Sequence, residues 1–243
     1  MHKNRLLEIL ARSHADALRN RLTMIDYVHG DVLAESGTPI ERVIFPRSGL
    51  VSLVVDLTDG DRIEAAMVGH EGAVGTAVAF GAMTHLCTGF AQLPGSAWVM
   101  KVADLIDFAA ADRDFRNALF AQEQFLLAQA QQTAACNAKH NIPQRLGSWL
   151  LRAQDLVSID ELLLTQEHLA QMLGVQRASV SMFASQLQER GLIHYRRGRV
   201  HIVDQRRLAS EACECHATLR QHRTRLFGEA LEETGVADHA LVG

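Results

Sequence analysis

Side chains that could donate hydrogen bonds to a polyanion gather between residues 165 and 199. Arginine, glutamine, serine and threonine side chains bind phosphate oxygens and the edges of bases. The positions with this chemistry are Thr165, Gln166, Gln176, Arg177, Ser179, Ser181, Arg196, Arg197 and Arg199. Their spacing predicts contacts with double-stranded DNA.

Two short helical patterns around a glycine must position these side chains. Thr165 can cap the first helix with its hydroxyl, and Gly174 suits the sharp turn that follows. A second helix is expected from about Gln176 to Arg190. The apolar positions are Leu169, Met172 and Leu173 in the first helix and Val180, Phe183, Ala184 and Leu187 in the second. This pattern predicts a helix-turn-helix whose second helix lies in the major groove.

A basic hairpin is expected after the second helix, with its turn at Arg197-Gly198. Arg196, Arg197 and Arg199 would contact phosphates from this wing. Residues 174–207 hold seven arginines and two acids, a local net charge of +5, whereas the whole chain carries −4. The basic charge is therefore localised, as a DNA-binding face requires. A plain helical hairpin with solvated arginines is the alternative.

The bulk composition indicates a cytoplasmic protein of one large or two modest domains. The 243 residues are 48% hydrophobic, and the four cysteines form no paired framework. The N-terminus is not signal-like. Residues 72–100 lack charged side chains, but five glycines and Pro94 favour short buried strands over a membrane span. No membrane partner is expected.

Strand and helix signals alternate along the rest of the chain. Residues 1–20 are amphipathic, and residues 27–102 read as short strands with turns, which predicts a compact β roll. A helix without glycine or proline is expected from Asp114 to Lys139, and more helices after Pro143 and Gln205. The long helix carries a weak heptad seam of Phe115, Leu119, Gln122, Leu126, Gln129 and Thr133. Leu119, Leu126 and Thr133 are the expected dimer contacts; packing of the helix on its own β domain is the alternative.

The combined pattern resembles the Crp/Fnr family of bacterial transcription regulators. The resemblance rests on Phe45-Pro46, Ser48-Gly49-Leu50, His70-Glu71-Gly72 and the stretch from Thr165 to Leu192. It implies an α+β fold: a jelly-roll-like β roll for an effector in residues 1–112, a dimerisation helix in 113–140 and a winged helix-turn-helix in 141–243. It also implies a homodimer on a palindromic operator, contact with RNA polymerase and no enzymatic activity.

The resemblance places effector contacts around Gly69, Glu71, Gly72 and Gly75. Members that bind cyclic AMP hold its phosphate with an Arg-Ser pair, but residues 63–100 contain no Lys or Arg. A buried phosphate without a cation is penalised, which disfavours cyclic AMP, although helix amides alone can hold a phosphate. The effector is left unidentified.

The family's recognition helix and its cysteine chemistry are matched only in part. In the family, an arginine, a glutamate and a second arginine of this helix contact nucleobases. Arg177 matches the first arginine, but Ala178 stands in place of the glutamate and Met182 in place of the second arginine. These differences predict a different operator sequence. Iron–sulfur members cluster cysteines near the N-terminus, whereas the first cysteine here is Cys87. No iron–sulfur cluster is therefore expected.

Cys213, Cys215 and His216 invite a metal or redox interpretation. Residues two apart on a helix point in nearly opposite directions, so Cys213 and Cys215 are expected to be buried thiols without a metal. Cys213 and His216 could still form half a site across a dimer. The alternative function is a metabolite- or redox-sensing module whose C-terminal domain contacts protein rather than DNA.

Overall fold

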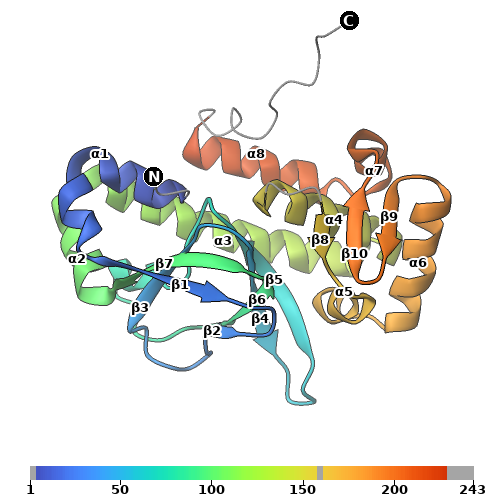
Figure 1. Cartoon of the computed structure of the whole chain (residues 1–243), viewed down its shortest axis with the longest axis horizontal. Coiled ribbons are helices and arrows are strands. Elements are labelled where there is room, and N and C mark those ends of the chain that lie inside the picture. The colour runs from blue at the N-terminus through green and yellow to red at the C-terminus, as the bar shows by residue number, and fades with distance from the viewer. Residues whose placement is uncertain (1–3, 158–160, 229–243) are drawn as a thin grey trace, which may run out of the picture.

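The computed structural model describes residues 4–157 and 161–228 and shows a β roll, a long helix and a C-terminal helical domain (Figure 1). The helices are α1 (Arg5–Arg19), α2 (Val102–Ala111), α3 (Arg113–Lys139), α4 (Ile142–Val157), α5 (Gln166–Leu173), α6 (Arg177–Glu189), α7 (Gln205–Glu211), α8 (Cys215–Phe227) and the 3-10 helix η1 (Thr76–Phe80). The strands are β1 (Leu22–Tyr27), β2 (Val32–Ala34), β3 (Arg42–Pro46), β4 (Leu50–Asp56), β5 (Arg62–Val68), β6 (Thr88–Leu93), β7 (Gly95–Lys101), β8 (Glu161–Leu163), β9 (Ile193–Arg196) and β10 (Arg199–Ile202).

The β roll consists of two antiparallel sheets. Their strand orders are β1-β7-β3 and β2-β6-β4-β5. One buried cluster of the roll consists of Tyr27 and of small or branched apolar side chains: Leu33, Ala34, Ile44, Val51, Val68, Val74, Ala91 and Ala97. In the uncharged segment after Gly72, β6 and β7 confirm the predicted β structure, whereas η1 is helical and the side chains of Met83 and Leu86 between η1 and β6 are exposed. No helix in the described part of the chain is long and apolar enough to cross a membrane.

The long helix α3 begins at a side-chain cap and packs on its own chain. Asp112 accepts a hydrogen bond from the Phe115 amide at 2.9 Å, the expected N-cap geometry. Phe115 and Leu119 are fully buried among side chains of α1, α2 and the roll. Leu126 packs against the roll interior. Helix α8 lies alongside α3 on another face (Figure 1).

The structure contradicts the predicted dimer seam at Leu119, whereas Leu126 and Thr133 are half-buried and remain predictions. Leu119 has no exposed area, Leu126 is partly buried against the roll, and Thr133 lines a small cavity beside Cys136. The physical reason is that the same chain covers the apolar face of α3, completely at Leu119 and in part at Leu126, so a second chain cannot reach Leu119. The large apolar side chains that α3 leaves exposed are Phe120 and Leu127.

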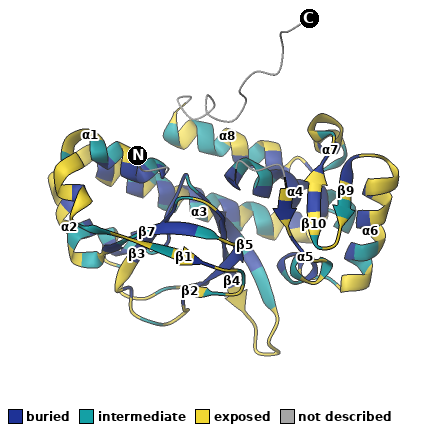
Figure 2. Ribbon diagram, viewed as in Figure 1, coloured by how far each residue is buried: buried dark blue, intermediate teal, exposed yellow. Residues whose placement is uncertain are grey.

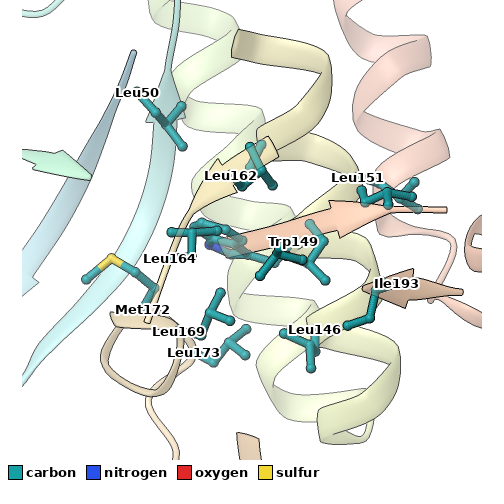
Figure 3. Close-up of a cluster of buried hydrophobic side chains, with 14 of the residues drawn as sticks. Leu50, Leu146, Trp149, Leu151, Leu162, Leu164, Leu169, Met172, Leu173 and Ile193 are labelled. Carbon is teal, nitrogen blue, oxygen red and sulfur yellow. The ribbon is translucent and has the colours of Figure 1, made fainter. Parts of the chain in front are cut away.

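The C-terminal domain shares a hydrophobic core with the roll. Trp149 and Leu146 of α4 meet side chains from both helices of the helix-turn-helix, and Leu50 and Met67 of the roll join the same cluster (Figure 3). The ring of His168 on α5 stacks on His29 at 3.7 Å between centroids. The C-terminal domain is thus docked on the β4–β5–β6 side of the roll, while the outer side of α6 stays exposed (Figure 2).

Candidate nucleic-acid interface

Helix α5 begins at a reciprocal cap that the sequence signalled only in part. The Thr165 hydroxyl accepts from the His168 amide at 3.2 Å, and the His168 ring accepts from the Thr165 amide at 3.4 Å. This arrangement is a capping box with histidine in the place of the usual glutamate. Gly174 ends the helix with φ +62°. The cap at Thr165 and the turn at Gly174 that the sequence predicts are therefore both confirmed.

Helix α6 presents its N-terminal turn to solvent. Gln176 is the N-cap and Arg177 the first helical residue, and both are exposed. The buried face of α6 comprises Val180, Ala184 and Leu187. Ser179 and Ser181 are half-buried, whereas Met182 is 51% exposed. An exposed methionine at this position can contact a thymine methyl group, a role that sequence reasoning did not assign.

The predicted wing is present as a three-stranded sheet of order β8-β10-β9. Its turn is Arg197-Gly198, with φ of +51° and +73°, which suits a two-residue hairpin. The Leu164 amide donates to the Gly198 carbonyl at 2.8 Å, so the turn is held beside the start of α5. Arg196 and Arg197 are exposed.

Arg199 differs from the other two wing arginines because it has an acidic partner. Its guanidinium lies 2.6 Å from the Glu161 carboxylate on β8. Both side chains are about half exposed, at 58% and 48%, and ion pairs of this kind are weak. Glu161 lies 38 residues away in sequence, so sequence reasoning could not anticipate the pairing.

A surface groove brings the predicted contacts together. It is lined by Thr165, Gln166, Glu167, Arg177, Tyr195, Arg197 and Gly198. Four of the nine predicted DNA contacts thus border one concavity between α5, α6 and the wing. The other five predicted contacts lie on α6 with its N-cap or on the wing, but do not line the groove: Gln176, Ser179, Ser181, Arg196 and Arg199.

Tyr195 is a groove residue that sequence reasoning missed. Its hydroxyl donates to the Leu164 carbonyl at 2.9 Å. Burial raises the pKa of Tyr195 to about 12, with Arg177 acting in the opposite direction. The phenol therefore stays neutral and holds the wing against the helix-turn-helix close to Arg177. Only its position next to Arg196 in the hairpin could have drawn attention to it.

Comparison with known proteins identifies both halves of this architecture. Residues 24–112 match the family model of the cyclic nucleotide-binding domain, and residues 144–211 match that of the Crp-like helix-turn-helix domain. This pair of domains, in this order around one long helix, is the Crp/Fnr architecture. The chain belongs to the Crp/Fnr family. No curated protein matches the chain in sequence.

Solved Crp/Fnr structures share the fold at low sequence identity. FixK2 from Bradyrhizobium japonicum aligns with a TM-score of 0.70 at 19% identity, over 79% of this chain and 98% of FixK2. The CRP-family transcriptional regulator TTHB099 from Thermus thermophilus aligns with a TM-score of 0.65 at 19% identity, over 77% and 96%. The c-di-GMP-responsive regulator CLP from Xanthomonas campestris aligns with a TM-score of 0.64 at 16% identity, over 79% of this chain and 99% of CLP. These likenesses show the Crp/Fnr fold.

The residues predicted to contact an effector do not surround one space in this Crp/Fnr chain. A side chain at Gly69 would meet Leu156 of α4, and one at Gly72 would meet Gln122 of α3. Gly75 lies elsewhere, as the cap of η1.

Glu71 borders a cavity formed with helices α3, α4 and α8. Burial raises its pKa, and its Oε2 atom has no hydrogen-bond partner. Glu71 thus belongs to the junction between the roll and the helices.

The expectation that this Crp/Fnr chain carries no cofactor and no iron–sulfur cluster is contradicted, and so is the expectation that its cysteines are buried thiols without a metal. Cys136, His140, Cys213 and Cys215 form a group that could hold a metal ion, with their ligand atoms all within 4.8 Å of one another. The helical argument against Cys213 and Cys215 fails because Cys213 lies in the turn between α7 and α8, before the first residue of α8. The partners come from α3, more than seventy residues earlier in the chain. His216 lies outside this group and pairs with Asp155.

Proposed function

We propose that this Crp/Fnr-type regulator binds a palindromic DNA operator as a homodimer and responds to an effector or signal through its β roll. The observation that carries the proposal is the groove in which Arg177 of α6 and Arg197 of the wing lie side by side with the N-terminus of α5. An exposed arginine at the start of a recognition helix can pair with a guanine edge. A basic wing and a capped helix N-terminus supply phosphate contacts.

The two chains of the dimer would place two such surfaces on one operator. Half-sites about 34–36 Å apart are expected for a two-fold symmetric helix-turn-helix protein. Contact of the bound dimer with RNA polymerase is part of the same proposal. The apolar filling of the roll suits a neutral, mostly apolar effector or a signal that acts through packing.

Fluorescence anisotropy with labelled duplexes tests the DNA-binding proposal. Fragments upstream of the protein's own gene are titrated with the wild type at several salt concentrations. Specific binding with a steep salt dependence is expected. Arg177→Ala should weaken it, whereas Arg12→Ala should leave it unchanged, because Arg12 is exposed on α1 at the opposite end of the molecule (Figure 1).

The alternative is a sensing module whose C-terminal domain contacts protein. This alternative predicts that the protein binds no duplex more tightly than an unrelated acidic protein of similar size does. Equal binding by the wild type and Arg177→Ala at every salt concentration would also remove the groove from the function.

A further inference from the structure

Four metal-binding side chains converge where the long helix ends. Cys136 lies in the last turn of α3, and His140 is the C-cap four residues later, on the same side of the helix. Cys213 and Cys215 flank Glu214 in the turn that leads into α8. The three thiols are buried, and the four ligand atoms lie within 4.8 Å of one another.

Two distances in this group match the spacing of ligands around one tetrahedral ion. The sulfur atoms of Cys136 and Cys213 are 3.6 Å apart, and the sulfur of Cys215 is 3.5 Å from Nδ1 of His140. Zinc binds sulfur at about 2.3 Å and imidazole nitrogen at about 2.0–2.1 Å, so a tetrahedral centre holds its ligands roughly 3.5–3.8 Å apart. The side chains therefore need little movement to coordinate an ion.

The surroundings also fit a metal site. Nδ1 of His140 faces Cys215, while Nε2 of the same ring lies 3.2 Å from the Glu214 carboxylate. Histidines that bind metals through one nitrogen usually donate from the other to a carboxylate. The Gln132 side-chain amide donates to the Cys215 sulfur at 3.1 Å. Such a bond stabilises a thiolate.

We propose that Cys136, His140, Cys213 and Cys215 bind one tetrahedral metal ion of the zinc class. On binding, the three thiols release their protons to solvent as three sulfur–metal bonds form, and Nδ1 of neutral His140 supplies the fourth. Tetrahedral sites with mixed sulfur and nitrogen ligands favour zinc among the common divalent ions.

The ion would join the end of the long helix α3 to the start of the C-terminal helix α8. Two ligands belong to α3 and two to the α7–α8 turn, and α8 then runs back along α3 (Figure 1). Within the described residues, no covalent cross-link holds α8 in place, because all four cysteines are free. The ion is therefore a clamp that fixes α8 and the DNA-binding domain relative to α3.

Metal analysis of the purified full-length protein tests the proposal. The wild type, prepared under reducing conditions with zinc supplied, should contain about one zinc per chain. Cys136→Ser, Cys213→Ser and Cys215→Ser should each lose it. Cys87→Ser is the matched control, since Cys87 lies in the roll outside the cluster, and it should retain the ion.

Cobalt replaces zinc in a second measurement, whose absorption spectrum reports the thiolate ligands directly. The wild type and Cys87→Ser should show the intense visible absorption of tetrahedral cobalt thiolate, and the three cluster variants should not. Absence of metal and of the cobalt spectrum in the reduced wild type would overturn the proposal. So would equal metal content in Cys215→Ser, or iron together with inorganic sulfide in place of a single ion.

Glu214→Gln isolates the positioning role of the carboxylate. The side chain is not a ligand, so the variant should fold and bind one ion, but with an affinity about 10–100-fold weaker in a chelator competition. Glu211→Gln is the control, because Glu211 pairs with Arg190 on the other side of the turn. Identical affinities in the wild type and Glu214→Gln would show that Glu214 does not orient His140.

Discussion

Trp149 donates its indole N–H to Oε1 of Glu64 at 2.9 Å, and this bond joins α4 of the DNA-binding domain to β5 of the roll. The second carboxylate oxygen accepts from the Ser52 hydroxyl. Glu64 is fully enclosed, and burial raises its pKa to about 7, although Arg152 and the two donors act in the opposite direction. A carboxyl group that titrates near neutral pH therefore lies at the junction of the two domains.

The first prediction concerns the pH dependence of stability. Because the folded pKa lies above the ordinary value, the folded protein keeps a proton on Glu64 that the unfolded chain loses. The contribution of this group is fully present below about pH 4.5 and is lost as the pH rises toward 7, up to roughly 3 kcal/mol. Glu64→Gln keeps an acceptor for Trp149 and cannot ionise, so it should remove that loss.

Urea unfolding at pH 5 and pH 8 checks this prediction. The difference in unfolding free energy between Glu64→Gln and the wild type should be larger at pH 8 than at pH 5. Glu35→Gln, on an exposed loop, should show no such change. A constant difference across this pH range would show that Glu64 ionises in the folded protein at its ordinary pKa.

The second prediction concerns base recognition by Arg177. Its exposed position at the first turn of α6 suits a base contact rather than a contact with the DNA backbone. Arg177→Ala should cost about 1–3 kcal/mol of binding free energy and relax specificity at one base pair in each half-site. Competition with operators substituted at each position measures both effects. An equal loss for every sequence would make Arg177 a phosphate contact.

Local signals explain why the helix-turn-helix could be predicted from the sequence. Thr165 and Gly174 act on their own neighbours, and the apolar spacing of α5 and α6 needs no distant partner. The wing turn at Arg197-Gly198 is local in the same way. Each of these features appears in the structure where the residues predict it.

Contacts between distant residues explain what the sequence could not show. Cys136 and Cys213 are 77 positions apart, and their meeting depends on how α8 folds back on α3. The heptad spacing of α3 predicts an apolar face but not which surface covers it. Glu71 lies in the motif that resembles an effector site, yet the docking of α4 places it against helices. Only the tertiary structure decides these cases.

The third prediction separates the wing arginines. Arg196→Ala and Arg197→Ala should each weaken binding to all sequences alike and lower the salt slope by about one unit. Arg199 starts in an ion pair with Glu161, so part of its charge is already compensated and Arg199→Ala should have a smaller effect. Glu161→Gln should strengthen binding, because it frees Arg199 and removes a negative charge near the DNA.

Salt titrations of the four variants against one operator and one unrelated duplex provide the measurement. The ratio of the two affinities should stay constant throughout. If Glu161→Gln weakened binding, the ion pair would instead be needed to hold the wing strand in place.

The last prediction places the contact of the proposed dimer on the exposed side of α3. Phe120 and Leu127 lie seven residues apart and are 55% and 52% exposed, and Phe80 adds an edge contact to the Phe120 ring. Burying such side chains against a second copy contributes up to about 1.5–3 kcal/mol each. Leu127→Glu should therefore dissociate the dimer in sedimentation velocity and leave the unfolding transition of the chain intact. Leu126→Glu should instead lower the melting temperature, because Leu126 packs on the roll of its own chain. A tight Leu127→Glu dimer would place the two-fold contact on another surface.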